Sequence, residues 1–265
     1  MIPKIIHYCW LSNDPIPQNL QTYMKSWRAF LPDYEFMLWD FNRFDKTSSI
    51  WVQEAFDKKK YAFAADYIRL YAVYNYGGFY FDMDVEVLKS FDDLLNMKSV
   101  ICWQDGYEGV EAACFGAEKG ASWLKACLDY YQNKHFINSK NKMELRPLPS
   151  IMEETLKETE YGIESVSSIK DVLNAESNKQ IVILPNYFFS PKSYQTGKIN
   201  KTEQTYAIHH FAASWVNPYD NKSFLGKILV FFHIPPIGKI WHFFHLPNTN
   251  IRKHLFKKQN QSINL

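Results

Sequence analysis

The first forty residues constrain the fold most, because they pass from a strand pattern to a helix pattern and back to a strand pattern. Residues 4–10 (KIIHYCW) form a short apolar run, which favours a buried strand. Residues 17–30 place apolar side chains at helical spacing, and Leu31-Pro32-Asp33 ends that pattern. Residues 34–40 are again largely apolar. This order predicts parallel strands joined by a crossover helix, and therefore an α/β fold.

The rest of the chain continues to alternate between helices and strands. Residues 50–76 are predicted as one long helix, which ends where Gly77 and Gly78 can adopt positive φ. The other expected elements are strands at 79–85 and 99–103, helices near 121–132 and 149–160, and a last clear strand at 181–185. No repeat or linker interrupts this pattern before about residue 220. We therefore expect one domain over residues 1–220.

The composition is that of a globular protein. Of 265 residues, 46% are hydrophobic and 22% charged, which excludes disordered, collagen-like and coiled-coil classes. The four cysteines, at positions 9, 102, 114 and 127, form no CxxC pair, so we expect buried thiols in a reducing compartment. The N-terminus is a poor signal peptide, and no run of 18 apolar residues is present. A cytoplasmic protein is expected.

Charge is distributed unevenly along the chain. Residues 221–265 hold seven Lys or Arg and no acid, whereas all 28 Asp and Glu lie in residues 1–220. Phe and Trp alternate with the cations in this basic tail, and prolines divide it into short predicted helices. Such a segment suits an anionic membrane surface, where each cation contributes about 1 kcal/mol. Core packing with a solvated basic face ranks second and nucleic-acid binding last.

The strongest chemical signal is the sequence Asp82-Met83-Asp84, directly after an apolar strand pattern. If the strand continues through it, both aspartates share one face with their Cα atoms roughly 6.6–7 Å apart. Two such carboxylates need solvent or a neutralising partner, and Mg²⁺ or Mn²⁺ with a nucleotide diphosphate would supply one. A strand that ends in a solvated turn would also explain them.

A second pair lies one predicted helix earlier. Asp66 and Arg69 are three residues apart and therefore adjacent on one helix face. Ala62 and Val73 lie on the same stripe, so the pair is expected to be partly buried. A surface ion pair is the alternative. Beside an aspartate pair, the carboxylate suits sugar hydroxyls and the guanidinium suits a diphosphate.

Three motifs together resemble the glycosyltransferases that share a sugar-binding region containing a DXD motif (glycosyltransferase family 32). They are IIHYCW at 5–10, the block AxxADYIRLYxxYxxGGFYFDxD within 61–88, and YAIHHFAASW at 206–215. The resemblance covers roughly residues 2–216. This group includes fungal initiating mannosyltransferases, bacterial capsule and surface-polysaccharide transferases and, more distantly, large glucosylating toxins.

The resemblance implies a GT-A fold, a Rossmann-like mixed sheet flanked by helices. The basic tail is expected to follow it as a helical C-terminal extension. It also implies a retaining reaction with a nucleotide-diphosphate sugar and Mn²⁺ or Mg²⁺. By the same resemblance Asp84 and Asp82 would bind the metal, and Asp82 also the ribose. Asp66 would hold hydroxyls of the donor sugar, Arg69 would contact the sugar or the phosphate, and Trp10 would stack on the base.

The late motif adds further candidates. One histidine of the His209-His210 pair can complete the metal shell; we choose His210, with His209 as the alternative. Ser214 and Trp215 can donate hydrogen bonds to the diphosphate, and Trp103 is expected to line the site. Many members of the family carry an Asn near residues 110–116; here Glu111 and Ala112 stand in its place, so the donor-sugar contact there is unassigned.

These observations predict a hexosyltransferase of bacterial surface-polysaccharide synthesis at the cytosolic face of the inner membrane. We expect a UDP-sugar rather than a GDP-sugar as donor, and a lipid-linked or glycan acceptor. The alternatives are a GDP-mannose-dependent mannosyltransferase and a non-catalytic nucleotide- or carbohydrate-binding module. A phosphodiesterase or nucleotidyltransferase would also use paired aspartates, but it would not explain Asp66–Arg69 or the late motif.

Overall fold

The computed structural model describes residues 1–104, 109–158, 163–166, 169, 171–172, 181–194 and 196–212. Its strands are β1 (Ile5–Cys9), β2 (Glu35–Trp39), β3 (Gly78–Phe81), β4 (Val85–Val87), β5 (Ser99–Cys102), β6 (Cys114–Ala117), β7 (Ile163–Ser165), β8 (Ile181–Leu184) and β9 (Ala207–His209). Its α-helices are α1 (Gln18–Phe30), α2 (Ile50–Asp57), α3 (Tyr61–Tyr76), α4 (Ser122–Asp129) and α5 (Leu148–Glu158). Short 3₁₀ helices cover Lys46–Ser48, Asp92–Leu94 and Asn186–Phe188.

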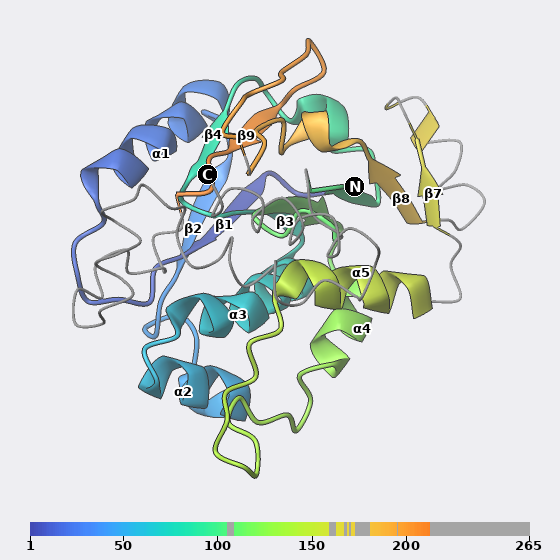
Figure 1. Ribbon diagram of the computed structural model, residues 1–265. Coiled ribbons are helices and arrows are strands. Elements are labelled where there is room, and N and C mark those ends of the chain that lie inside the picture. The colour runs from blue at the N-terminus through green and yellow to red at the C-terminus, as the bar shows by residue number, and fades with distance from the viewer. Residues whose placement is uncertain are drawn as a thin grey trace, which may run out of the picture. The chain divides into compact units, whose positions relative to one another are not determined.

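Seven of the strands form one mixed sheet in the order β2-β1-β3-β6-β5-β8-β7. β1 pairs in parallel with β2 and β3, and β8 pairs in parallel with β5 and β7. β6 runs antiparallel to both its neighbours, β3 and β5. The unit β1–α1–β2 is the predicted strand–helix–strand crossover. The predicted α/β class, a Rossmann-like mixed sheet flanked by helices, is therefore confirmed (Figure 1).

The region predicted as one helix over residues 50–76 is two helices. α2 begins at the N-cap Ser49, whose side chain accepts a hydrogen bond from the amide of Val52. It ends at Asp57, and Lys59 then adopts a φ of 57°, which an α-helix does not tolerate. α3 starts at Tyr61 and ends at Tyr76, and the capping residue Gly77 has a φ of 69°, so the predicted glycine stop is confirmed.

The strand predicted over residues 79–85 is interrupted at the aspartates. β3 ends at Phe81, a turn follows, and β4 begins at Val85 in a second sheet, where it pairs antiparallel with β9. The prediction that Asp82 and Asp84 share one face of one strand is therefore wrong. The amide of Val85 donates to the carbonyl of Asp82 at 3.0 Å, which closes the turn and redirects the chain.

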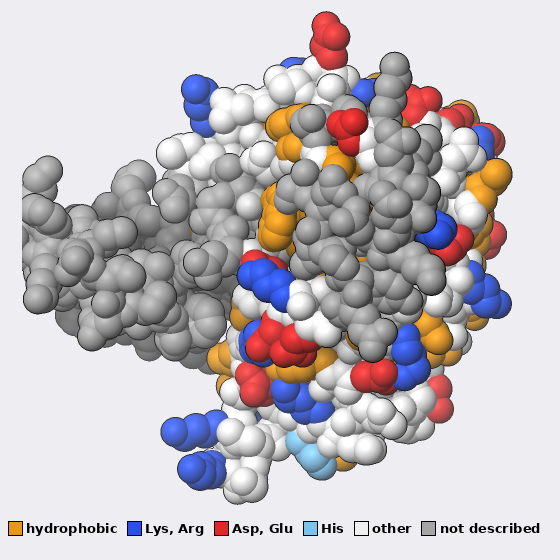
Figure 2. Space-filling view, turned by 90° about the vertical axis from the view of Figure 1, so that its right-hand side faces the viewer, with side chains coloured by type: hydrophobic (Ala, Val, Ile, Leu, Met, Phe, Trp, Pro, Cys, Tyr) orange, Lys and Arg blue, Asp and Glu red, His pale blue; other side chains and the backbone are white. Residues whose placement is uncertain are grey.

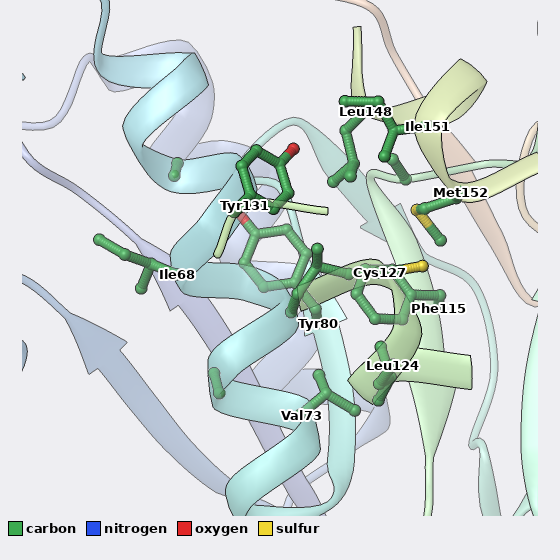
Figure 3. Close-up of a cluster of buried hydrophobic side chains, with 14 of the residues drawn as sticks. Ile68, Val73, Tyr80, Phe115, Leu124, Cys127, Tyr131, Leu148, Ile151 and Met152 are labelled. Carbon is green, nitrogen blue, oxygen red and sulfur yellow. The ribbon is translucent and has the colours of Figure 1, made fainter. Parts of the chain in front are cut away.

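The large sheet separates two apolar cores, and the residues of β3 alternate between them. Tyr80 packs with α2, α3, α4 and α5 on one face, whereas Phe79 and Phe81 pack with α1 and β4 on the other. Figure 3 shows the first core, with Tyr80 and Phe115 from the sheet surrounded by side chains from the helices. This alternation places Asp82, two residues after Tyr80, on the α3 side.

The four cysteines are all buried and unpaired, as the sequence predicts. On the face in Figure 2, acidic and basic side chains lie intermixed. In the part of the chain that the structure describes, no helix is long and apolar enough to cross a bilayer. Met1–Ala212 forms one compact unit. The predicted boundary at residue 220 and the basic tail lie outside the described residues.

Candidate active site

The predicted site residues gather at one edge of the large sheet. β1, β3 and β5 share one direction, because β6 is antiparallel to both β3 and β5. Trp10, Asp82 and Trp103 directly follow these three strands, so they lie at the same edge. Glu111 precedes β6, which runs the opposite way, and is therefore at this edge too. The carboxyl edge of such a sheet is where α/β proteins commonly bind ligands.

Hydrogen bonds hold the turn between the two aspartates in place. The amide of Asp82 donates to the carbonyl of Ala113 at 2.7 Å. The Tyr80 hydroxyl donates to Oδ1 of Asp82 at 2.8 Å. The amide of Ala212 donates to Oδ2 of Asp84 at 2.7 Å. Asp84 is buried, whereas the Asp82 side chain keeps 31% of its surface exposed, so the site opens to solvent on the Asp82 side.

Arg69 joins the helix pair to the aspartate turn. Its Nη2 lies 3.3 Å from Oδ1 of Asp66, and its Nη1 lies 3.3 Å from Oδ2 of Asp82. Nη1 also donates to the carbonyl of Ala112 at 2.8 Å, and the guanidinium carbon lies 4.7 Å from the centre of the Tyr80 ring. Asp66 and Arg69 are both buried, as the apolar stripe on α3 predicts. One guanidinium thus holds two carboxylates together.

The structure replaces His210 by His209 as the histidine at the aspartates. β9 pairs with β4 so that His209 lies opposite Val85, next to Asp84, and its Nε2 is 3.6 Å from Oδ2 of Asp84. The ring of His210 points away because successive side chains of a strand alternate. Its Nε2 lies 2.7 Å from Oε2 of Glu86, and its ring stacks on Tyr23.

Glu111 is a site residue whose contact the sequence did not predict. The side chain is fully buried, its Oε2 lies 3.1 Å from Nδ1 of His209, and its Oε1 accepts a hydrogen bond from the amide of Ala113 at 2.8 Å. The sequence marks it only as an acid where the family carries an Asn. The available signal was a glutamate inside the apolar run VEAACF at 110–115, since a carboxylate that is buried with such a run needs a partner from elsewhere in the chain.

Burial and the neighbouring charges set the pKa values of these groups. Burial raises the pKa of Asp66 to about 7, although Arg69 acts against it. Burial also raises the pKa of Asp82. Burial acts to raise the pKa of Asp84 as well, but His209 outweighs it and the value falls to about 2. Glu111 and Asp84 outweigh burial at His209 and raise its pKa well above the ordinary value.

The residues at the turn fit a divalent cation. One ligand atom each from Asp82, Asp84 and His209 lie within 4.8 Å of one another, so a single ion could contact all three. Two carboxylate oxygens and an imidazole nitrogen suit Mn²⁺, and the oxygens suit Mg²⁺. Two adjacent carboxylates, one of them buried, also need positive charge close by.

The remaining predicted residues fall into two groups. Trp10 is half-buried, and its Nε1 donates to the carbonyl of Asp14 at 2.7 Å. Trp103 is half-buried, and its amide donates to the carbonyl of Leu184. The base-stacking role of Trp10 and the lining role of Trp103 stay predictions. Ser214 and Trp215 lie outside the described residues.

A family model and several curated proteins match parts of this chain. Residues 17–101 match the family model described as "Glycosyltransferase sugar-binding region containing DXD motif". Inositol phosphoceramide mannosyltransferase 3 of Schizosaccharomyces pombe is 33% identical over 127 residues, covering 46% of this chain and 35% of that protein. Mannosyl phosphorylinositol ceramide synthase SUR1 of Saccharomyces cerevisiae is 33% identical over 99 residues, covering 36% and 26%. The chain thus spans about a third or less of the curated relatives it matches.

Solved structures show a weaker likeness. The PaToxG glycosyltransferase has a TM-score of 0.47 and 18% identity, covering 67% of this chain and 74% of that one. The apo-form glycosyltransferase GlyE of Streptococcus pneumoniae has a TM-score of 0.41 and 13% identity, covering 90% and 62%. We draw no conclusion from structural similarities with TM-scores this low. The family match spans α3 and both aspartates, so residues 17–101 are similar to the glycosyltransferase sugar-binding regions that contain a DXD motif.

Proposed function

We propose that this protein is a glycosyltransferase that uses a divalent cation and a nucleotide-diphosphate sugar. The observation that carries the proposal is the convergence of Asp82, Asp84 and His209 beside the buried Asp66–Arg69 pair. The family match over residues 17–101 supports the same chemistry. A paired-aspartate hydrolase would need no buried Asp–Arg pair next to its cation ligands, so the transferase reading explains more of the site.

The residues have distinct tasks in this proposal. Asp82, Asp84 and His209 would hold the cation, which when bound supplies positive charge to the leaving diphosphate. Asp82 is also exposed enough to accept a hydrogen bond from a ribose hydroxyl. Arg69 keeps Asp66 and Asp82 in place and adds a positive charge close to the site. Asp66 would accept hydrogen bonds from sugar hydroxyls. Retention of anomeric configuration is part of the proposal, and no nucleophile is assigned.

The proposed donor is a mannose donor, in place of the UDP-sugar expected from the sequence. The matched relatives are named as mannosyltransferases or as a mannosyl phosphorylinositol ceramide synthase, and they come from fungi. Nothing in these matches supports the predicted role in bacterial surface-polysaccharide synthesis or a UDP-sugar. We therefore put GDP-mannose first, which was the alternative on sequence grounds, and test UDP-sugars beside it.

The acceptor proposal is a lipid with a polar head group. The names of the relatives refer to an inositol phosphoceramide lipid. The basic tail has the composition of a segment that binds an anionic membrane. Together these support a peripheral protein that works on the cytosolic face of a membrane. Nucleic acid is not part of the proposal.

A thermal-shift panel tests the donor and the cation together. GDP, UDP, GDP-mannose and UDP-sugars are each added with Mn²⁺, with Mg²⁺ and with EDTA. A ligand at 100 times its Kd stabilises the folded state by about 2.7 kcal/mol. We expect a cation-dependent shift with one base, lost in Asp84→Asn. Asp129→Asn, an exposed acid on α4, is the matched control and should keep the shift.

Turnover separates an enzyme from a binding module. Release of the nucleoside diphosphate from the chosen donor is measured with and without a phosphoinositol ceramide acceptor, and the product anomer is read by NMR. Cation-dependent binding without turnover on any acceptor or water would favour the binding module. A complete absence of nucleotide binding would contradict the proposal.

A further inference from the structure

We infer that Glu111 is a positioning residue for the cation site: its carboxylate keeps a proton on Nδ1 of His209 and thereby turns Nε2 toward Asp82 and Asp84. The inference rests on the proposed function, because an Nε2 directed at two carboxylates is useful when a cation binds between them. It assigns a role to a buried acid that the DXD match, which ends at residue 101, does not include.

The first argument is the difference between the two sides of the imidazole. Nδ1 of His209 lies at hydrogen-bond distance from Glu111, 3.1 Å, whereas Nε2 lies 3.6 Å from Oδ2 of Asp84. A separation of 3.6 Å is too long for a hydrogen bond. The ring is therefore held from the Glu111 side, and Nε2 is the nitrogen left for a ligand. Histidines that bind metals commonly donate their other N–H to a carboxylate in this way.

The second argument is that Glu111 itself cannot move easily. Its amide donates to the carbonyl of Cys102 at 2.8 Å, and its Oε1 accepts from the amide of Ala113 at 2.8 Å. The adjacent residue Val110 forms a bridge with Trp103. The side chain is fully buried, so Oε2 faces His209 from a fixed position.

The third argument concerns why the residue is a glutamate. The carboxylate receives two donors, the amide of Ala113 on Oε1 and the Nδ1–H of His209 on Oε2. A carboxylate accepts through both oxygens, whereas a carboxamide has one acceptor and one donor end. In Glu111→Gln the single carboxamide oxygen must accept the hydrogen bond from the amide of Ala113, because that amide can only donate. The NH₂ group then faces Nδ1, which must accept a hydrogen bond, so the neutral ring of His209 carries its proton on Nε2, where the proton blocks a cation.

The test measures the ring proton and the cation separately. In ¹⁵N-histidine-labelled protein, long-range ¹H–¹⁵N spectra show which nitrogen of His209 is protonated, with the signal assigned by its loss in His209→Gln. We expect Nδ1 to be protonated in the wild type, with and without Mg²⁺, and unprotonated in Glu111→Gln. Calorimetric titration with Mn²⁺ alone should show an affinity about 10–100-fold lower in Glu111→Gln.

The chain offers a matched control. Glu86→Gln makes the same change at the acid that contacts the neighbouring histidine, His210, which points away from the aspartates. Glu86→Gln should leave both the His209 signal and the Mn²⁺ affinity unchanged. Glu111→Asp keeps both acceptors and should retain the proton on Nδ1. Thermal unfolding of each variant establishes that it is folded.

The outcomes distinguish this inference from the proposed function. An unprotonated Nδ1 in the wild type would overturn the inference even if Glu111→Gln does not fold. So would a wild-type Mn²⁺ affinity in a folded Glu111→Gln. If the wild type keeps the proton on Nδ1 but binds neither Mn²⁺ nor any nucleotide, the hydrogen bond is supported, and it is the proposed function that fails.

Discussion

Arg69 balances the negative charge of the site, since Asp66 and Asp82 both contact its guanidinium. Removing one partner of a buried ion pair destabilises the fold by more than the intact pair stabilises it, because the remaining charge is buried without compensation. The side chain of Arg69 is only 7% exposed, so water cannot replace it. This residue is therefore where stability and the site are most closely connected.

We predict that Arg69→Met lowers the free energy of unfolding by about 3–5 kcal/mol at pH 8. Without the guanidinium the pKa values of both carboxyl groups rise in the folded state. The folded protein then binds more protons than the unfolded chain, so the loss should shrink as the pH falls from 8 to 5. Chemical denaturation at both pH values measures it. A partial recovery in Arg69→Met/Asp66→Asn is expected, and equal losses at both pH values would argue against this account.

At the residue scale, sequence patterns predicted the charged groups better than their contacts. Asp66, Arg69, Asp82 and Asp84 all lie together as expected. The choice between His209 and His210 depended on the register of β9 against β4, which no local pattern specifies. Glu111 was visible only as a departure from a family pattern, because its partner lies 98 residues away in sequence.

Among the elements, β1 depends on a buried histidine that links it to two other segments. The Nε1–H of Trp39 donates to Nδ1 of His7 at 3.0 Å, and Nε2 of His7 contacts the carbonyl of Gly77 at 2.8 Å. Nδ1 therefore accepts, and Nε2 carries the proton. A second proton on Nδ1 would face the indole N–H, and burial lowers the pKa of His7 to about 4.

We predict that His7 makes the fold sensitive to acid. Because its pKa is about 4 in the folded protein and about 6.5 unfolded, the unfolded chain binds more protons between these values. Stability should fall by about 3 kcal/mol as the pH drops from 6.5 to 4. Denaturation at several pH values would show it. In His7→Gln this part of the pH dependence should be absent, and an unchanged profile would exclude His7 as its source.

The start of β3 allows a sharper test of packing. Gly78 has a φ of 102°, and a Cβ there would lie 2.5 Å from the carbonyl oxygen of Ile5 in β1. Gly120 also has a positive φ, 78°, but nothing lies within 4 Å of its Cβ position. Gly120→Ala should therefore cost about 1–2 kcal/mol from backbone strain alone, and Gly78→Ala clearly more. Similar unfolding midpoints for both would contradict the close contact between β1 and β3.

The helices and strands were predictable where the apolar pattern was long or where Pro or Gly marked its end. The positions of β1, α1, β2, β5 and β8 follow from apolar runs and proline stops. The break between α2 and α3 was missed because Lys58–Lys60 contains neither Gly nor Pro. The strands β6, β7 and β9 were missed because three or four residues show no period, and pairing rather than propensity makes them strands.

For the whole molecule, we predict that the basic tail provides membrane attachment. The full chain should bind vesicles that contain phosphatidylserine and bind phosphatidylcholine vesicles much less. A chain that ends at residue 220 retains the compact unit Met1–Ala212 and should lose this binding. High salt should release the full chain, because surface cations are screened. Vesicle sedimentation measures all three, and equal binding by the shortened chain would contradict the prediction.

The pairing of β4 with β9 also fixes when the site can form during synthesis. Asp82 and Asp84 leave the ribosome before His209, together with the α3 residue Arg69 that contacts Asp82. His209 follows more than a hundred residues later, so a nascent chain that has reached only β8 has the sheet but two of the three proposed cation ligands. A chain terminated before β9 therefore lacks His209 and cannot form the three-residue cluster at the aspartates.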